Sequence, residues 1–140
     1  MSGGDGWVGT VIDVSKWQSS LPDLSGVLGV IARAGLGTQP DTMFTTHIAN
    51  ARKTGKWVGS YWYNWGSLSV SDQVNAYIAR EKAVGGVSLH AIDWEGADGF
   101  TAAQTADFIR IYRARTGDPI LLYASEGRFR DLGQDGDWIA

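Results

Sequence analysis

Short runs of β-branched and aromatic residues alternate along the chain with longer stretches whose apolar positions recur at helical spacing. This alternation is typical of βα units, in which a helix returns the chain to the next parallel strand. Each short run is entered or left through Gly, Pro or Asp, as strand ends often are. The pattern predicts six strands, near Thr10–Ser15, Gly29–Ala34, Trp57–Tyr63, Ser88–Glu95, Pro119–Ser125 and Asp137–Ala140.

The longer stretches carry apolar side chains three and four residues apart, which is the spacing of one helix face. Three helices are expected between the strands. Their apolar positions are, in order, Phe44, Ile48 and Ala51; Val74, Tyr77 and Ile78; and Phe108, Ile111 and Tyr112. The third helix has the best-defined ends, because Thr101 and Gln104 have the spacing of a capping box and Gly117 follows the last turn.

The length of the chain indicates one domain. Its 140 residues, 44% of them hydrophobic, suffice for a single core but not for two well-packed ones. The glycine-rich residues 1–6 are expected to be a flexible lead, and residues 7–140 to form the domain. Parallel strands linked by helices either close into an eight-stranded barrel or lie as an open doubly wound sheet. A complete barrel needs about 200 to 250 residues, which this chain does not have.

Composition and charge exclude several partners and chemistries. Twelve Lys and Arg stand against fifteen Asp and Glu, giving a net charge of −3 without a basic block, so nucleic acid is not an expected partner. No apolar run approaches about 18 residues, so no membrane span is expected. The sequence contains no cysteine and no Gly-x-Ser-x-Gly motif, and thus lacks these nucleophile signatures. Gly35-Leu36-Gly37-Thr38 lacks the further residues of a phosphate-binding loop and is interpreted as a turn.

Three acidic side chains fall at the carboxyl ends of predicted strands. Asp93 and Glu95 are two residues apart, so in a strand they point to the same face while Trp94 points to the other. Asp13 has a similar place at the end of the first strand. Because active sites of parallel α/β folds gather at this end of the strands, the three carboxylates are expected to meet in one site.

Crowded carboxylates oppose each other's ionisation, and one of them then keeps its proton near neutral pH. Hydrolysis of a glycosidic bond needs a protonated carboxyl for the leaving oxygen and a carboxylate facing the developing positive charge. Glu95 and Asp93 can fill these roles. Two other interpretations stay open: acids that cap helices or pair with arginine, and a hard-metal site for Mg²⁺ or Ca²⁺. His47 falls in a helix and His90 points away from Asp93, so both are expected to be packing or surface residues and no metal or cofactor is predicted.

Aromatic side chains are abundant, with seven Trp and five Tyr, and several fall at predicted strand ends. The residues expected in the core are Trp57, Tyr77, Phe108 and Tyr112. The strand-end group is expected to surround the same opening as the acids and to offer stacking faces and hydroxyl groups to sugar rings. Its members are Tyr61, Trp62, Tyr63, Trp65, Tyr123 and Trp138.

In this order and at these spacings, the residues resemble the lysozyme-type muramidases of glycoside hydrolase family 25, found in phage endolysins and secreted bacterial enzymes. The run Asp13-Val14-Ser15-Lys16-Trp17-Gln18 is similar to the family's opening Asp-x-Ser-x-x-Gln, and Asp93-Trp94-Glu95 is similar to its signature. Further matches are Val30-Ile31-Ala32-Arg33-Ala34, Asp41 to Phe44, Ala51-Arg52-Lys53-Thr54-Gly55-Lys56, Gly59-Ser60-Tyr61, Leu122-Tyr123 and Trp138-Ile139-Ala140.

The resemblance implies an irregular TIM-like β/α barrel, here incomplete with about six parallel strands. Its implied activity is cleavage of the β-1,4 bond between N-acetylmuramic acid and N-acetylglucosamine, so peptidoglycan glycan strands are the expected partner. Glu95 matches the proton donor, Asp93 the acid proposed as nucleophile or as orienter of the acetamido group, and Asp13 the supporting carboxylate. The aromatic residues expected to bind substrate are Tyr61, Tyr63, Tyr123 and Trp138.

The chain also departs from the family pattern. Tyr61-Trp62-Tyr63 stands where many members have Tyr-His-Phe, and Gly35-Leu36-Gly37 where many have Thr-Glu-Gly. The family continues beyond Trp-Ile-Ala, whereas this sequence ends at Ala140. Either another chain or segment completes the barrel, or the sequence is a truncated piece, or it is a reduced version of the fold.

Three functions follow from these observations. The first is the muramidase, the second a non-catalytic wall-binding or structural phage component, and the third a metal-dependent α/β enzyme that uses the same acids. The first residues lack the features of a secretory signal. Together with the resemblance, this predicts action on the bacterial cell wall after delivery as a phage endolysin or virion component, or after secretion by another route.

Overall fold

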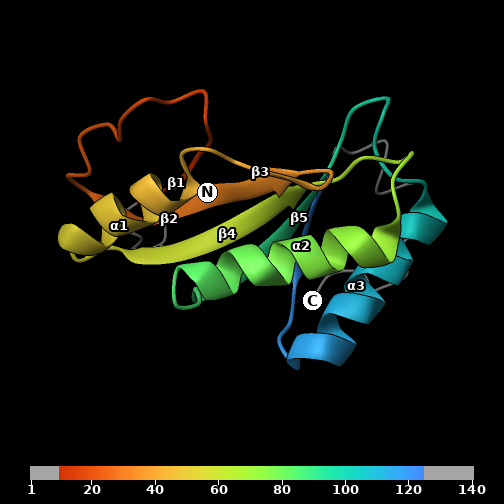
Figure 1. Cartoon of the computed structure of the whole chain (residues 1–140). Helices are drawn as coiled ribbons and strands as arrows, with labels where there is room; N and C mark the ends of the chain where they lie inside the picture. The colour runs from red at the N-terminus through yellow and green to blue at the C-terminus, as the bar shows by residue number, and fades with distance from the viewer. Residues whose placement is uncertain (1–9, 125–140) are drawn as a thin grey trace, which may run out of the picture.

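The computed structural model describes residues 10–124, which form a curled sheet with helices along one side (Figure 1). The elements are, in chain order, β1 (Thr10–Val14), β2 (Val27–Leu36), β3 (Gln39–Pro40), α1 (Phe44–Lys53), β4 (Trp57–Tyr63), α2 (Val70–Ala83), β5 (Leu89–Trp94), α3 (Ala102–Thr116) and β6 (Leu121–Ala124). The strand order is β1-β2-β4-β5-β6 with every neighbouring pair parallel, while β3 pairs with β2 in the antiparallel direction. These residues form an α/β half-barrel of five parallel strands and one short antiparallel strand.

All five strands expected within residues 10–124 are present, which confirms the α/β class. The expected span Gly29–Ala34 is too short, because β2 runs from Val27 to Leu36, and the short strand β3 was not expected. The interpretation of residues 35–38 as a turn is right only for the second half of that segment. Gly35 and Leu36 continue β2, and Gly37, with φ of 63°, begins the turn into β3. The sixth predicted strand, Asp137–Ala140, and the lead 1–6 lie outside the described residues.

Glycine at position 35 permits this hairpin. A Cβ there would lie 2.6 Å from the ring of Trp62 and 2.4 Å from the carbonyl oxygen of Gln39, closer than packed atoms approach. The backbone N–H of Gly37 donates to the carbonyl oxygen of Tyr63 at the end of β4 (3.0 Å). Close approach of the Trp62 ring and the Gln39 backbone explains Gly35, and the positive φ of the turn explains Gly37.

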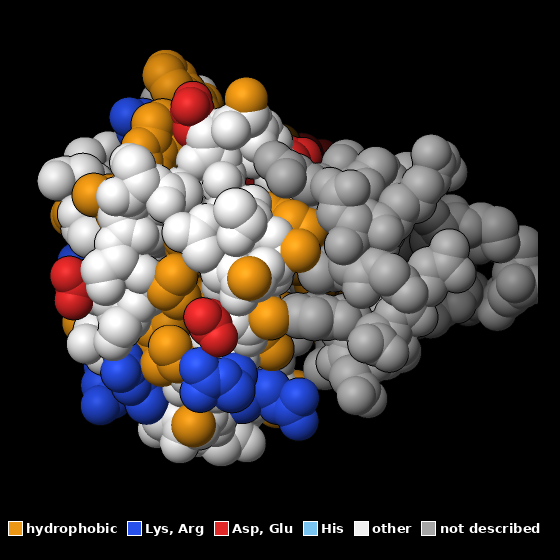
Figure 2. All heavy atoms as spheres, turned by 90° about the vertical axis from the view of Figure 1, so that its right-hand side faces the viewer, with side chains coloured by type: hydrophobic (Ala, Val, Ile, Leu, Met, Phe, Trp, Pro, Cys, Tyr) orange, Lys and Arg blue, Asp and Glu red, His pale blue; other side chains and the backbone are white. Residues whose placement is uncertain are grey.

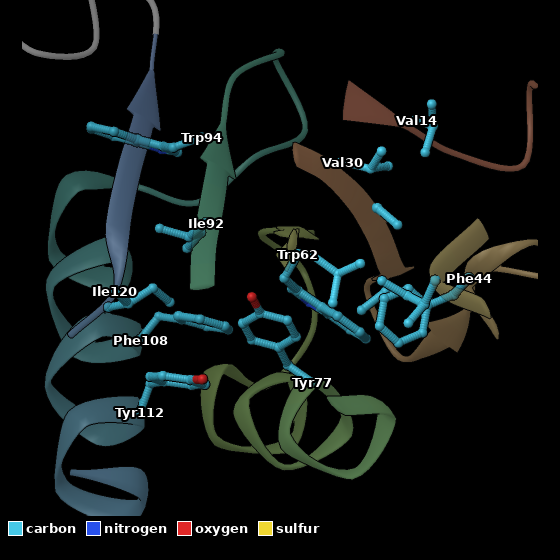
Figure 3. Close-up of a cluster of buried hydrophobic side chains, with 14 of the residues drawn as sticks. Val14, Val30, Phe44, Trp62, Tyr77, Ile92, Trp94, Phe108, Tyr112 and Ile120 are labelled. Atoms are coloured by element: carbon cyan, nitrogen blue, oxygen red, sulfur yellow. The ribbon is translucent and has the colours of Figure 1, made fainter. Parts of the chain in front are cut away.

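Alternate side chains of the inner strands face the helices and form the core (Figure 3). Buried strand residues on this face include Val30, Ala32, Ala34, Val58, Trp62, Ile92 and Trp94. Tyr77 of α2 lies 5.6 Å from Trp62 between ring centroids and stacks on Phe108 and Tyr112 of α3, so all three are core residues as predicted. Trp62 was wrongly expected at the site opening, because its position in β4 turns it toward the helices. Trp57, expected in the core, is partly exposed.

The ends of α3 follow the capping signals in the sequence. The hydroxyl group of Thr101 accepts from the backbone N–H of Gln104 (3.2 Å), and the Gln104 side chain accepts from the backbone N–H of Thr101 (2.8 Å). Gly117 ends the helix with φ of 75°. Arg113 and Arg115 lie in the last turn, near the negative end of the helix dipole. Figure 2 shows Lys and Arg side chains gathered at the lower edge of the face in view. No helix within residues 10–124 is long and apolar enough to cross a membrane.

A buried carboxylate joins the helices to the sheet on the core side. Glu81 of α2 accepts hydrogen bonds from the hydroxyl groups of Ser60 and Tyr112, both at 2.6 Å, and bonds to Nδ1 of His90 in β5. The hydrogen bond to Glu81 raises the pKa of His90, with burial acting in the opposite direction. As expected from the sequence, His90 points away from Asp93 and has a packing role.

His90 is expected to make the stability of the fold depend on pH. A histidine whose pKa is higher in the folded chain adds stability below its unfolded value of about 6.5, and this stability is lost as the pH rises through the folded value. The difference in unfolding free energy between the wild-type chain and His90→Gln should therefore be largest near pH 5.5 and shrink toward about pH 8.5. Urea unfolding at several pH values measures it. In a Glu81→Gln background, the same comparison should lose this pH dependence; its persistence there would contradict the role of the Glu81–His90 pair.

Candidate active site

The other face of the sheet opens into a pocket with a volume of about 400 Å³. Most of its lining comes from odd-numbered strand residues, because the even-numbered ones face the helices. The lining residues are Asp13, Ser15, Trp17, Ile31, Arg33, Tyr61, Tyr63, Leu89, Ala91, Asp93, Glu95, Leu121, Leu122 and Tyr123. All five parallel strands contribute, and the volume falls within the range of small-molecule sites.

The three acids that the sequence places at strand ends all line this pocket. Asp13 comes from β1, Asp93 from β5, and Glu95 directly follows β5. The backbone of Asp93 is held by the buried Asn64, whose Nδ2 donates to the Asp93 carbonyl oxygen at 2.6 Å. The Oδ1 atom of Asp93 is buried and makes no hydrogen bond within residues 10–124. The ionised form of this side chain is therefore poorly stabilised.

These surroundings raise the pKa of Asp93 to about 7. Burial is the largest cause, followed by the charge of Glu95, a hydrogen bond with the Glu95 side chain, and the charge of Asp13. Arg33 acts in the opposite direction. The sequence predicts that one of the crowded acids keeps its proton near neutral pH, and in the structure this acid is Asp93.

Arg33 of β2 is a pocket residue that the sequence analysis did not single out. Its Nε donates to Oδ2 of Asp41 at 2.8 Å, and the Asp41 side chain is fully buried. The Arg33 side chain itself is 11% exposed, so this positive charge is largely shielded from water. It lowers the pKa of Asp93 and opposes the rise in the pKa of Tyr61. Asp41 thus fixes a cation inside an acidic pocket, where the cation limits how strongly Asp93 holds its proton.

Tyr61 and Tyr63 of β4 bring hydroxyl groups into the pocket. Burial raises the pKa of both above the ordinary value of 10, and the charge of Asp93 adds to the rise. Both hydroxyl groups therefore stay protonated at neutral pH and can donate hydrogen bonds to sugar oxygens. Tyr123, which is 64% exposed, lines the pocket from the edge strand β6. Trp138, the fourth aromatic residue predicted to bind substrate, lies outside the described residues.

The pocket lining differs from the predicted aromatic group at three positions. Trp62 faces the helices, and Trp65 lies in the loop after β4, where its backbone N–H donates to Oε1 of Gln73 (3.0 Å). Trp17, which the sequence places in the opening motif but not in the site, lines the pocket and is 76% exposed. Trp17 lies in the turn after β1, so strand alternation does not predict its place in the pocket.

His47 of α1 has a structural role, as expected. Its ring is fully buried, and Nε2 donates to the carbonyl oxygen of Ser15 at 3.0 Å. Within residues 10–124, no group of three or more His, Asp or Glu side chains is arranged to hold a metal ion. The geometry of these residues therefore does not favour the metal-site interpretation of the three acids.

Comparison with known families shows the family to which the chain belongs. The model of glycosyl hydrolases family 25 matches residues 12–139. The chain belongs to glycosyl hydrolase family 25. It is thus a glycoside hydrolase by family, and the resemblance carried by its motifs is confirmed. No curated protein matches the sequence at a significant level.

Solved structures with the family 25 fold are similar over nearly all of the chain. The catalytic domain of endolysin ply40 from bacteriophage P40 of Listeria monocytogenes matches with a TM-score of 0.82 at 22% identity, over 98% of this chain and 72% of that one. A family 25 glycosyl hydrolase from Bacillus anthracis matches with a TM-score of 0.77 at 18% identity, over 90% of this chain and 64% of that one. A muramidase from Trichobolus zukalii matches with a TM-score of 0.74 at 25% identity, over 90% of this chain and 69% of that one. The chain therefore spans about two thirds of the length of these proteins.

Glu95 is expected to control the pKa of its neighbour Asp93. Because the Glu95 carboxylate disfavours a second negative charge beside it, Glu95→Gln should lower the pKa of Asp93 from about 7 toward its ordinary value of 3.8. Carbon-13 NMR titration of the aspartate carboxyl groups measures the change, with Asp93→Asn used to assign the signal. An unchanged or higher pKa would show that the two groups are not coupled.

Replacement of Arg33 should change the same pKa in the other direction. Arg33→Gln removes the positive charge that favours ionised Asp93, so the pKa of Asp93 should rise above about 7. Arg33→Lys keeps a charge and should give a smaller rise in the same NMR titration. Thermal unfolding checks that both variants stay folded, because each disturbs the partner of buried Asp41. A folded Arg33→Gln chain with an unchanged or lower Asp93 pKa contradicts this role of Arg33.

Proposed function

We propose that the chain is a muramidase that hydrolyses the β-1,4 bond between N-acetylmuramic acid and N-acetylglucosamine in peptidoglycan. The observation that carries the proposal is the pair of Asp93 and Glu95: a carboxyl group with a pKa of about 7 lies beside a second carboxyl group in an open pocket. Glycosidic hydrolysis uses such a pair. Membership of family 25, and the endolysin and muramidase names of proteins with the same fold, support peptidoglycan as the substrate class.

Glu95 is the proton donor in this proposal. The pKa of Asp93 of about 7 lets its carboxyl group hold a proton near neutral pH, and in the proposal this proton passes to Glu95. The proton goes to the glycosidic oxygen as the bond from that oxygen to the anomeric carbon breaks, and positive charge develops on the sugar. Asp93, now ionised, either faces this charge directly or orients the acetamido group of the substrate, and Asp13 supports it. Water then supplies a hydroxyl group to the anomeric carbon and returns a proton to the pair.

The tyrosines of the pocket are proposed to hold the sugars on either side of this bond. Tyr61 and Tyr63 donate hydrogen bonds from hydroxyl groups that stay protonated at neutral pH. Tyr123 offers a largely exposed ring from β6. Trp138 is proposed to add a further aromatic contact.

A non-catalytic wall-binding or structural component is the second candidate. The half-barrel favours it: the parallel strands of residues 10–124 do not close into a ring, and the chain spans 72% of the ply40 catalytic domain. We propose that another chain, or a segment outside the described residues, completes the barrel. A protein of this second kind would co-sediment with peptidoglycan and release no reducing ends. If reducing ends are released, loss of that activity with EDTA would favour the metal-dependent enzyme.

The proposed place of action is the bacterial cell wall. Delivery as a phage endolysin or virion component is supported by similar structures of two endolysins, ply40 and CTP1L. Secretion is the other proposed route. Both routes bring the pocket to the glycan strands of the wall.

Glu95→Gln should abolish wall hydrolysis without loss of the fold. Glutamine keeps the shape of the side chain but cannot supply the acidic proton, and the rate should fall at least about hundredfold. Turbidity loss of cell-wall suspensions and release of reducing ends measure the rate. Asp107→Asn is the matched control, because Asp107 is an exposed acid on α3 paired with Arg110, and it should keep full activity. Retained clearing by a folded Glu95→Gln chain would remove Glu95 from the acid role.

A further inference from the structure

We infer that Trp17 is a stacking platform for a sugar ring of the glycan strand, away from the bond that is cleaved. The inference rests on the proposed function and names a further binding residue for it. Trp17 is the most exposed large hydrophobic side chain within residues 10–124, at 76%, yet it lines the pocket that contains the acids. An indole left in water forgoes the stabilisation that burial gives, so its place beside a pocket indicates a ligand that covers it.

Hydrogen bonds fix the turn that carries Trp17. The backbone N–H of Ser15 donates to Oε1 of Gln18 (2.8 Å), and the N–H of Gln18 donates back to the carbonyl oxygen of Ser15 (3.1 Å). The N–H of Trp17 donates to the hydroxyl group of Ser15 (3.3 Å). From α1, the buried His47 donates to the same Ser15 carbonyl oxygen (3.0 Å). The turn is thus held by its own side chains and by a helix of the core.

Asp41 connects this turn to the interior of the pocket. Its Oδ2 accepts from the backbone N–H of Lys16 at 2.9 Å and from Nε of Arg33 at 2.8 Å. One fully buried carboxylate therefore positions both the residue next to Trp17 and the cation of the pocket. Because the backbone of this turn is already fixed, it loses little conformational freedom when a ligand contacts Trp17. The contact is therefore preorganised.

Lys16 sets which face of the indole is available. Its Nζ lies 5.0 Å from the centroid of the Trp17 ring, within range of a cation–π interaction. The ammonium group lies over one face of the ring, and in the inference the opposite face receives a flat ligand. A β-linked pyranose presents an apolar face of C–H groups, which matches an indole in size and polarity. A pyranose ring is therefore the ligand class that this surface fits.

Trp17 and Tyr123 line the pocket from opposite ends of the strand order. Trp17 follows β1 and Tyr123 belongs to β6, with three strands between them. Neighbouring strands are about 4.8 Å apart, so four such intervals separate the two residues along the sheet. In this inference the two aromatic residues contact different sugars of one glycan strand, because they line the pocket from the two ends of the strand order. The acid pair belongs to β5 and its end, next to β6, so the inference assigns Trp17 to a sugar on the β1 side of the reacting bond.

A contact remote from the reacting bond should affect binding more than chemistry. Such a contact stabilises the bound substrate and the transition state equally, so its loss raises KM and leaves kcat unchanged. A residue that only supported the catalytic acids would lower kcat instead. This difference separates a binding platform from a structural role.

The test compares Trp17→Ala and Trp17→Phe with Leu28→Ala in the full chain. Leu28 is a matched control, because it is an exposed apolar residue (38%) that does not line the pocket. Calorimetry in the Glu95→Gln background measures binding of peptide-free peptidoglycan glycan strands. Trp17→Ala should weaken binding about tenfold, the scale of one lost stacking contact, and Trp17→Phe should restore it to within about threefold. With Glu95 intact, the KM for these strands should rise about tenfold in Trp17→Ala at unchanged kcat, and Leu28→Ala should match the wild type.

The outcomes separate this inference from the proposed function. Unchanged affinity in Trp17→Ala overturns the platform, while the muramidase stands if the wild-type chain still releases reducing ends. Binding that depends on Trp17 without release of reducing ends supports the platform and overturns the hydrolase. Absence of glycan binding by every chain overturns both. A loss of kcat at unchanged KM also overturns the platform, and thermal unfolding confirms that the exposed substitutions leave the fold intact.

Discussion

The alternation of side chains along β5 is the constraint on which both the core and the site depend. Ile92 and Trp94 face the helices, and Asp93 and Glu95 face the pocket. A slip of one residue would bury the acids in the core and put Trp94 in water, so the register is strongly specified. The indole N–H of Trp94 donates to the carbonyl oxygen of Phe100 at 2.6 Å, which ties the strand to the loop after it. The burial of Ile92 and Trp94 stabilises the fold and also directs Asp93 and Glu95 into the pocket.

Two carboxyl groups on opposite sides of the sheet show how differently the fold treats buried acids. Glu81 has three partners on the core side, from β4, β5 and α3, so its charge is well satisfied. Asp93 has a buried oxygen without a hydrogen bond in the described part of the chain, and two further acids nearby. Satisfied polar groups are the rule in native interiors, and exceptions concentrate at functional sites. The contrast supports a chemical role for Asp93 and a structural one for Glu81.

The sequence predicted those parts of the structure that depend on local periodicity. Strand positions, the capping box of α3 and the shared face of Asp93 and Glu95 all follow from spacing along the chain. The same alternation also places Trp62 in the core, so the prediction that Trp62 lies at the opening was wrong. The pair of Arg33 and Asp41 was beyond this reasoning, because it depends on how β3 turns back onto β2. The local spacing of residues carries no direct signal for such a tertiary contact.

Convergence of the acids does not require a closed barrel. Asp93 and Glu95 belong to one strand and its end, and Asp13 reaches the same pocket through a sheet that curls within five strands. The positive charge opposite them is fixed between β2 and the residue after β3. What closure would change is access of water, and burial is the largest cause of the raised pKa of Asp93. Further strands over the open side would therefore raise the pKa of Asp93 further. The arrangement of the three acids is already set by the residues from β1 to the end of β5.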